Sequence, residues 1–359
     1  MSDPPLRMTP ASTTIIIVAY NGKEFLETCL QSVVREAEPN CEILVVDNAS
    51  TDGCADSVER EYPCIRLIRN QENRGFVVAC NQGASAAKGR YLVFLNQDTE
   101  VLSGWLSELI TPLERNPSVG LTTSKALLLS DPSRINSCGL DVHFAGLSSA
   151  RGFGCDSACY AEVENVAAVC GASFAVRNEV WQQLGGFDGD FFMYFEETDL
   201  SWRAQLLGYD SLYVPASVLL HAHSPGIRPS SYFYSERNRG TMLARNWKFA
   251  TLLILSGGLL LAELASLAYT FSGGREAVLA KARAYAALVL ALPEILSARR
   301  TVQASRIVQD HRILALRSDR IRAQEVTGGK VGRFALGCLN VGLQANFWAA
   351  QKIMRFLDL

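Results

Sequence analysis

The sequence lacks the marks of several common protein classes. Its ten cysteines include no Cys-x-x-Cys pair, Cys155 and Cys159 being the closest two, so we interpret them as reduced thiols rather than a disulfide framework. Acidic and basic residues nearly balance, 36 against 34, which leaves no global basic field for nucleic acid. The first twelve residues contain no apolar segment of a signal peptide, so we expect a cytoplasmic protein.

Two loops that bind phosphate groups are also missing. No Gly-x-Gly-x-x-Gly follows the first apolar run, where Val18 to Gly22 stand, and no Gly-x-x-x-x-Gly-Lys-Ser/Thr occurs anywhere. These absences argue against dehydrogenases and P-loop enzymes. A nucleotidyltransferase is disfavoured because it would carry a Gly-rich loop near the N-terminus. A diphosphate can still be held through a divalent cation with oxygen and histidine ligands.

What is present is a regular alternation of apolar, β-branched runs with segments of helical periodicity. The pattern predicts the order β-α-β-α-β-α-β, hence an α/β fold with a parallel sheet and helices on both faces. The expected strands are Thr14–Tyr20, Cys41–Asp47, Ile65–Arg69 and Arg90–Leu95, and the expected helices are Lys23–Glu36, Cys54–Tyr62 and Gly75–Ala87.

The pattern is less regular after Gly120. We expect a loop-rich stretch at 130–160 on the acceptor side of a cleft, followed by a further strand, helix, helix and strand at 171–177, up to 184, 196–207 and 211–214. The domains expected from these elements are a disordered N-terminus at 1–12, an α/β domain at 13–247 and a helical region at 248–359.

Polar residues follow the expected strands, at the edge where parallel sheets bind ligands. Asp47 ends one strand, where its carboxylate can accept hydrogen bonds from a base or ribose, or can satisfy the following turn. Asp98 follows another strand, as a metal ligand or as a helix N-cap. His221 and His223 end a third apolar run on one face, and we interpret this pair as functional rather than structural.

An acidic run follows a cluster of bulky apolar and aromatic residues. Glu196, Glu197 and Asp199 come directly after Phe191 to Phe195. Carboxylates beside aromatic surface lose solvation and repel one another, so they are stable mainly where a cation, a proton or a ligand hydroxyl compensates. The alternative is a solvated first turn of a helix, which suits acidic side chains.

Several motifs occur in the order seen in family 2 glycosyltransferases. The chain resembles the rhamnosyltransferase-like members over about 13–247, in the segments 17–21, 45–53, 73–76, 81–83, 95–98, 171–172 and 195–200. The resemblance implies a GT-A fold, a Rossmann-like domain that binds a nucleotide-diphospho-sugar. It also implies a divalent cation and inversion at the anomeric carbon.

By position, the resemblance implies roles for individual residues. The nucleotide sugar would contact Ala19, Tyr20, Asn21, Asp47, Asn73, Gly75, Asn81, Asn96, Arg237 and Asn238. Asp98 and His221 would ligate Mg²⁺ or Mn²⁺, with one carboxylate fewer than usual because Asn96 replaces the first acid of the Asp-x-Asp-type motif.

The catalytic base of the family falls at Glu197, where most relatives carry Asp. Glu196 and Asp199 would orient the base or the acceptor, and Asp199 remains an alternative base.

The C-terminal region is apolar and locally basic. The stretch 249–271 is long enough to cross a membrane but is interrupted by Gly257, Gly258 and Glu263, and residues 299–333 hold nine basic against three acidic side chains. Membrane-surface association, true spanning and packing on the α/β domain all remain open, and the membrane-prone surface arrangement is favoured by charge placement.

We therefore expect an inverting glycosyltransferase that moves a sugar to a hydroxyl of a glycan or lipid-linked acceptor in cell-surface polysaccharide synthesis. The favoured donor is dTDP-rhamnose, with UDP- or GDP-sugars possible. The expected location is the cytoplasmic face of the inner membrane, without nucleic-acid partners. The alternative is a membrane-associated, nucleotide-sugar-binding pseudoenzyme or scaffold.

Overall fold

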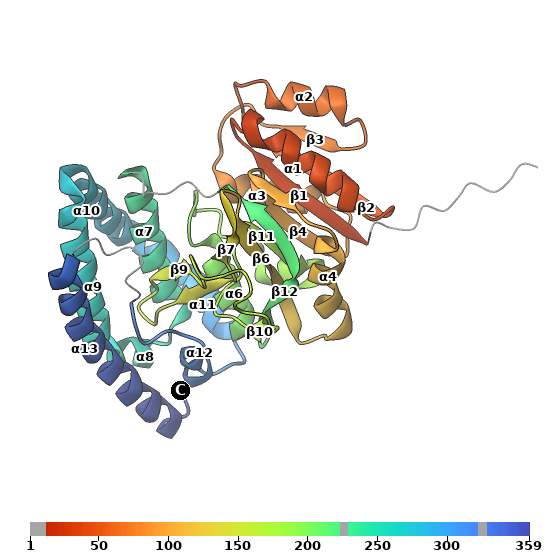
Figure 1. Cartoon of the computed structure of the whole chain (residues 1–359). Coiled ribbons are helices and arrows are strands. Elements are labelled where there is room, and N and C mark those ends of the chain that lie inside the picture. Colours follow the sequence, from red (N-terminus) through yellow and green to blue (C-terminus); the bar gives the residue numbers. More distant parts are fainter. Residues whose placement is uncertain (1–11, 223–228, 322–328) are drawn as a thin grey trace, which may run out of the picture.

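The computed structural model describes residues 12–222, 229–321 and 329–359. The predicted alternation of strands and helices in the N-terminal part is confirmed. It comprises β1 (Thr13–Ala19), α1 (Lys23–Glu36), β2 (Cys41–Asp47), α2 (Cys54–Glu61), β3 (Arg66–Arg69), α3 (Phe76–Ala86) and β4 (Tyr91–Asn96). These strands pair in parallel in the order β4-β1-β2-β3 (Figure 1).

The next part of the chain completes the sheet. It comprises β5 (Thr99–Val101), α4 (Trp105–Arg115), β6 (Val119–Leu128), β7 (Asp131–Ser137), β8 (Leu140–Val142), β9 (Ser148–Ala150), β10 (Glu164–Asn165), β11 (Ser173–Arg177), α5 (Asn178–Leu184), α6 (Glu196–Leu206) and β12 (Asp210–His221). The stretch expected to be loop-rich thus holds three short strands. The two apolar runs near 211–214 and 219–221 form one strand, β12, interrupted by a register shift between Val214 and Val218.

The predicted parallel pairing is confirmed for β1 to β4, but the sheet as a whole is mixed, because β11 runs antiparallel to both β4 and β6. The reason lies at the entry to β11, where the Asn96 N–H donates to the Ala172 carbonyl at 3.1 Å. The chain therefore enters β11 at the carboxyl end of β4 and must run back along it. The result is a mixed α/β sheet whose ligand-binding edge gains the turn around Gly171.

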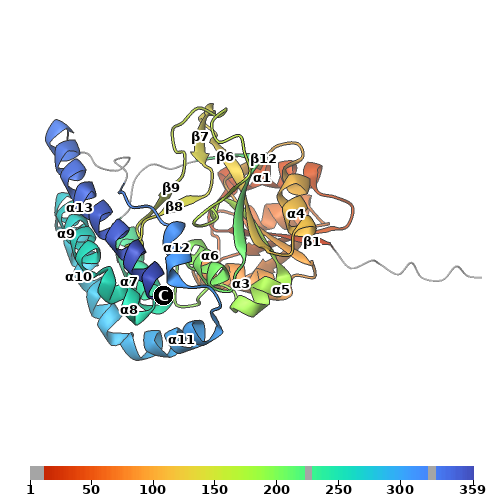
Figure 2. The ribbon, with the colours of Figure 1, turned by 90° about the horizontal axis from the view of Figure 1, so that it is seen from below.

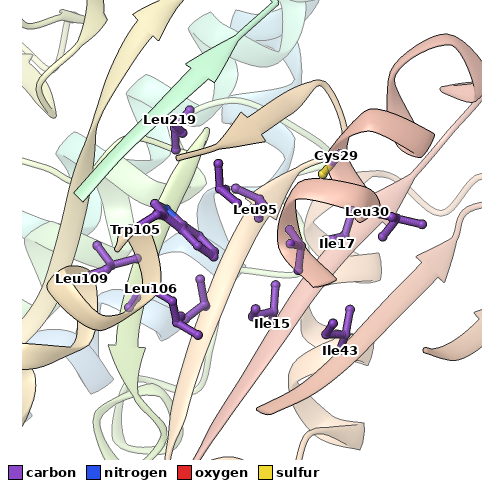
Figure 3. Close-up of a cluster of buried hydrophobic side chains, with 14 of the residues drawn as sticks. Ile15, Ile17, Cys29, Leu30, Ile43, Leu95, Trp105, Leu106, Leu109 and Leu219 are labelled. Carbon is purple, nitrogen blue, oxygen red and sulfur yellow. The ribbon is translucent and has the colours of Figure 1, made fainter. Parts of the chain in front are cut away.

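One layer of core lies between the sheet and helices α1 and α4 (Figure 3). Ile15, Ile17 and Leu95 point from the strands toward Trp105, which is fully buried. The Trp105 indole N–H donates to hydroxyl groups of Ser124 and Ser173 at 3.1 and 3.0 Å, so its one polar atom is satisfied. Each such aliphatic side chain contributes about 1.5–3 kcal/mol when fully buried. This layer holds the strand ends of the site in place.

The C-terminal part of the chain is helical. It comprises α7 (Pro229–Asn246), α8 (Phe249–Ile254), α9 (Ser256–Ser272), α10 (Gly274–Leu290), α11 (Leu292–Ser305), α12 (Asp310–Ala315) and α13 (Gly329–Phe356). Across 12–222, 229–321 and 329–359, no helix is long and apolar enough to cross a bilayer, so the spanning arrangement finds no support.

These helices pack on the α/β part through a shared apolar cluster. Trp202 of α6 meets Trp247 edge to face at 4.7 Å between ring centroids, and Phe144 and Phe347 belong to the same cluster. The Trp247 indole N–H donates to the Phe144 carbonyl at 3.2 Å. In Figures 1 and 2 the α9 and α13 helices lie beyond α6 and the β8–β9 hairpin when viewed from the main sheet.

Candidate active site

The ends of β1 and β4 are joined by the side chain of Gln97, for which the sequence motifs predicted no role. The Gln97 amide accepts from the Tyr20 N–H at 3.0 Å and donates to the Tyr20 carbonyl at 3.1 Å. This pairing leaves the Tyr20 ring 45% exposed, at the edge where a base could stack. Asn21 adopts a left-handed φ of 46°, and its side-chain oxygen accepts from the Thr51 N–H at 2.8 Å. Ala19 is buried in β1 just before this turn.

The end of β2 organises the neighbouring loop. Asp47 is buried and accepts from the Ser50 N–H at 3.1 Å, so the turn-forming alternative raised for it is part of its role. The next residue, Asn48, was not singled out as a site residue, yet its amide donates to Asn73 at 2.9 Å and to the Gly75 carbonyl at 3.2 Å. The segments that follow β2 and β3 are thus hydrogen-bonded to each other at the edge of the sheet where a ligand would bind.

Gly75 packs against Phe192, in the turn that precedes Glu196 and Glu197 and is called the acidic turn below. Its φ is +84°, and a Cβ there would lie 2.5 Å from the Phe192 ring. Only glycine permits both the left-handed backbone and this close approach.

Asn81 and Asn96 have mainly structural contacts. The Asn81 amide group donates to the Phe187 carbonyl at 2.9 Å and accepts from the Phe187 N–H at 3.0 Å, which fixes the chain ahead of the acidic run. Asn96 ends β4 half-buried, and its carbonyl accepts from the Thr99 hydroxyl at 2.7 Å. Each residue therefore positions a segment of the site.

The two predicted metal ligands come together. The His221 Nε2 lies 3.4 Å from an Asp98 carboxylate oxygen, and the His221 Nδ1 lies 2.9 Å from the side-chain oxygen of Asn136. Because an amide oxygen only accepts, Nδ1 carries a proton and Nε2 faces the carboxylate. Asn136 lies 85 residues away in sequence, and no motif indicated it. His223 lies outside the described residues.

Among the described residues, no three His, Cys, Asp or Glu side chains group into a site that could hold a metal. The Asp98 and His221 pair offers two ligands. In the neutral His221 ring, the Nε2 lone pair faces an Asp98 carboxylate oxygen, and these two acceptors repel each other. A cation bound between them would remove this repulsion. This donor set fits a divalent cation whose remaining ligands are diphosphate oxygens and water.

The acidic run opens α6 behind a strained turn. Tyr194 and Phe195 both have left-handed backbones, with φ of 69° and 70°. Non-glycine residues adopt this conformation at a cost, and such strain concentrates at functional sites. After this turn, Glu196 is buried and Glu197 is half-buried, and both line the same pocket.

Burial dominates the titration of this acidic pair. It raises the pKa of Glu197 from 4.5 to about 7. Burial, and then the charge of Glu197, raise the pKa of Glu196 well above its usual range. The Glu196 Oε2 has no hydrogen-bond partner in the structure. The solvated-turn alternative does not describe this pair, because Glu196 is buried and Glu197 is only partly exposed.

Asp199 sits in a different environment from the two glutamates. Its carboxylate is fully buried, accepts hydrogen bonds from Arg203 Nε at 2.7 Å and the Asn246 amide at 3.1 Å, and forms an ion pair with Arg245 at 2.5 Å. Burial alone would raise the pKa of Asp199, but Arg245 and Arg203 overcome it and lower the pKa to about 2. The geometry makes Asp199 an anchor between α6 and α7.

Arg237 and Asn238 hold the strained turn from α7. The Asn238 amide donates to the carbonyls of Met193 and Tyr194 at 2.9 and 2.8 Å. Arg237 donates to the Asn238 side-chain oxygen at 3.0 Å and to the Asp190 carbonyl at 2.6 Å. Burial lowers the pKa of Arg237. Both side chains thus fix the backbone that aims Glu196 and Glu197.

A pocket of about 510 Å³ adjoins the acidic turn. Its lining includes Glu196, Glu197 and Thr198 of α6, the β8–β9 hairpin, and residues of α7, α9 and α13. The C-terminal helices therefore contribute to the same cavity as the acidic pair.

Comparison with known proteins identifies the family. A model described as glycosyl transferase family 2 matches residues 14–126, and one described as glycosyl transferase family group 2 matches residues 91–297. The N-acetylglucosaminyl-diphospho-decaprenol L-rhamnosyltransferase of Mycobacterium tuberculosis is 27% identical over 245 residues, which cover 61% of this chain and 79% of the relative. The O-antigen biosynthesis protein RfbC of Myxococcus xanthus is 28% identical over 235 residues, which cover 62% of this chain and 18% of the relative.

Two solved structures share the fold. GalNAc-T7 with UDP, GalNAc and Mn²⁺ aligns with a TM-score of 0.59 and 20% identity. The alignment covers 72% of this chain and 52% of the GalNAc-T7 chain. TarS of S. aureus aligns with a TM-score of 0.52 and 14% identity over 96% of this chain and 91% of that chain. These likenesses confirm the GT-A-like mixed α/β fold.

The family match covers more than half of the chain, from residue 91 to residue 297. The chain belongs to the family 2 glycosyltransferases, and within them it is rhamnosyltransferase-like. It is therefore an enzyme that transfers a sugar.

Proposed function

We propose that this enzyme moves a sugar from a nucleotide-sugar donor, with inversion, to a hydroxyl of a glycan or lipid-linked acceptor in cell-surface polysaccharide synthesis. The observation that carries the proposal is the half-buried Glu197 at the wall of a pocket, where burial raises its pKa to about 7. The donor we favour is dTDP-rhamnose, because the M. tuberculosis relative is an L-rhamnosyltransferase. UDP- and GDP-sugars are the other candidates.

Glu197 is the base in this proposal. A general base works best when its pKa lies near the operating pH, and such catalysis contributes about 10²–10⁴-fold. The acceptor oxygen forms a bond to the anomeric carbon as the bond from that carbon to the diphosphate oxygen breaks. The acceptor proton passes to Glu197, and the diphosphate leaves with the electron pair. Asp199 supports the base by anchoring α6, because its own carboxylate is fully engaged with arginines.

The donor would lie along the strand ends. The exposed Tyr20 ring offers a stacking surface for the base, and Asp47 offers a carboxylate for ribose or base hydrogen bonds. Arg237 lies on the same side as the acidic turn, where its positive charge favours the leaving diphosphate.

Asp98 and His221 would hold Mg²⁺ or Mn²⁺ against the diphosphate. Such a cation, when bound, neutralises negative charge on the leaving group. Asn136 supports this role by orienting the imidazole from its Nδ1 side. The pseudoenzyme alternative is not favoured, because a raised Glu197 pKa and a paired Asp98 and His221 would serve no purpose in a scaffold.

A panel of nucleotide sugars with Mg²⁺ or Mn²⁺ tests the donor and metal assignments. One donor should raise the melting temperature of the wild type only when the metal is present. Asp98→Ala should abolish this shift, while Asp56→Ala, which removes a carboxylate that is 69% exposed on α2, should keep it. An unchanged metal-dependent shift in Asp98→Ala would remove Asp98 from the metal site.

We also propose that the enzyme is a peripheral protein on the cytoplasmic face of the inner membrane. An exposed stripe on α9 contains no polar or charged residue: Gly257, Leu260, Leu261, Leu264, Ala268 and Phe271. The end of α13 exposes Trp348, Phe356 and Lys352, the mixture of aromatic and basic residues that suits a membrane surface.

Flotation with vesicles that contain anionic lipid tests this location. The wild type should float with the vesicles, and the double variant Leu260→Ser and Leu264→Ser should float much less. The matched control changes Val163 and Ile307, which are 55% and 75% exposed elsewhere, to Ser. Equal loss in both double variants, or no flotation of the wild type, would contradict the membrane proposal.

A further inference from the structure

The pocket beside Glu197 has one polar wall. Glu196 Oε2, Thr198 Oγ1 and Ser148 Oγ are buried and have no hydrogen-bond partner among the residues that the structure describes. Buried polar atoms are normally paired, because an unpaired one costs about 1–3 kcal/mol. Three such atoms around one cavity indicate that a hydroxyl-rich ligand completes this wall.

His143 adds a donor to the same wall. The Ala145 N–H donates to the His143 Nδ1 at 3.2 Å, so the ring proton lies on Nε2, which also has no partner. Burial lowers the pKa of His143 to about 3, so the ring stays neutral at physiological pH. A neutral N–H donor suits an uncharged hydroxyl.

The C-terminal helices add apolar side chains to the pocket, namely Ala265 and Tyr269 of α9 and Leu336 and Leu339 of α13. Polar lining residues from the same helices are Ser235, Glu236 and Arg239 of α7 and Ser266 and Thr270 of α9. Residues of α6, α9 and α13 thus line one pocket, although the three helices are far apart in the sequence. Sugar alone does not need aliphatic leucines, whereas a hydrocarbon chain does.

The helix α9 carries apolar residues on two of its faces. Ala265 and Tyr269 line the pocket together with Ser266 and Thr270, while Leu260 and Leu264 belong to the exposed stripe. Apolar residues on two faces of one helix are normally both buried. Here one face meets the pocket and the other meets the proposed membrane surface, so α9 joins the two apolar environments.

We propose that this pocket binds the acceptor, and that the acceptor is an amphiphile. Its hydroxyl-bearing head lies between His143, Ser148 and Glu197, and its hydrocarbon chain lies against α9 and α13. This inference rests on the proposed function, because it makes the pocket the acceptor side of the transfer site. It selects the lipid-linked acceptor over a free glycan.

Rigid support for the pocket comes from a buried ionic cluster. Arg239 pairs with Glu236 and Glu263 at 2.7 and 2.6 Å, and Lys281 pairs with the same two acids at 2.8 and 2.9 Å. This cluster ties α7, α9 and α10 together beside the pocket, and its members Glu236 and Arg239 also line it. The pocket is therefore held open by fixed helices rather than formed by a loose gap.

The test uses maltose and the n-octyl, n-decyl and n-dodecyl β-maltosides as probes, each below its micellar concentration, with binding measured by titration calorimetry. Complete burial of the chain predicts affinity that rises about fourfold per added methylene. Maltose alone should bind far more weakly than the decyl compound, with one chain per protein.

Two variants on one helix separate the pocket from the outer surface. Ala265→Trp fills the pocket wall and should weaken decyl-maltoside binding at least tenfold, while Ala268→Trp, on the exposed stripe, should leave it unchanged. Both variants should keep the wild-type melting temperature shift with the donor, which shows that they fold.

Affinity that does not depend on chain length would overturn the proposal, and so would equal effects of the two tryptophans. The first result would indicate a free glycan, and the second would place the chain on the outer face. Because binding of the maltosides requires no turnover, a protein that binds them but transfers no sugar would refute the proposed function alone.

Discussion

The most informative perturbation is the replacement of Glu197 by glutamine, because it predicts a more stable but less active enzyme. Glu197 is an acid whose pKa rises from 4.5 in the unfolded chain to about 7 in the fold. The folded state therefore holds the proton more tightly than the unfolded state between these values. Stability is then lost as the pH rises from about 4.5 to 7, and the full penalty applies above pH 7.

The size of this penalty follows from the difference between the two pKa values. Each unit of pKa difference corresponds to about 1.36 kcal/mol, so the rise of the Glu197 pKa from 4.5 to about 7 gives an upper limit of about 3 kcal/mol for the penalty. Glutamine keeps the shape and cannot ionise. Glu197→Gln should thus raise the free energy of unfolding at pH 8 by about 1–3 kcal/mol and by nearly nothing at pH 4.5.

Urea denaturation at several pH values measures this difference. The matched control is Glu179→Gln in the first turn of α5, where the side chain is 76% exposed, and it should change stability by less than about 0.5 kcal/mol at every pH. A Glu197→Gln variant no more stable than the wild type at pH 8 would show that Glu197 is solvated or paired. The burial argument for the base would then fail.

Three further changes test the support around the base. Asn238→Ala removes both bonds to the strained turn, so transfer should fall at least tenfold while the donor-dependent melting shift persists; a loss of both together would indicate general unfolding instead. Asp199→Asn removes the buried negative charge that pairs with Arg203 and Arg245 and should cost about 3–5 kcal/mol in urea denaturation, and a cost below 1 kcal/mol would refute its role as an anchor. Lys281→Met removes a buried cation from the cluster beside the pocket and should cost a similar amount, with an unchanged midpoint contradicting that role.

Much of the α/β part could be predicted from the sequence because its signals are local. The strand β1 is an unbroken apolar, β-branched run, and the helix α1 has apolar residues at regular helical spacing, so each reveals itself within one segment. The direction of β11 could not be predicted this way. It depends on where the chain re-enters the sheet beside Asn96, which is a tertiary fact.

The same distinction between local sequence signals and tertiary contacts applies to the residues of the site. Asp98, His221 and the acidic pair stand next to strand ends or in dense motifs, so the sequence pointed to them. Asn136 and His143 carry no local signal, because Asn136 is distant from His221 in sequence and His143 lies in a short hairpin region. The opposite environments of Glu197 and Asp199, only two residues apart, arise from arginines on other turns and helices.

The packing of the C-terminal helices was left open by the sequence for a related reason. An apolar stretch such as 249–271 suits a bilayer, a bilayer surface or a protein core equally well. The structure divides it into α8 and α9 and uses one face of α9 for the pocket.

Sugar transfer by Glu197→Gln at saturating donor tests the central claim most directly. The measured quantity is acceptor-dependent release of the nucleoside diphosphate at pH 8, compared with the wild type. We expect a loss of at least a hundredfold, with the donor-dependent melting shift retained, because the base is gone but the donor site is intact. Transfer at a rate near that of the wild type would contradict the assignment of Glu197 as the base.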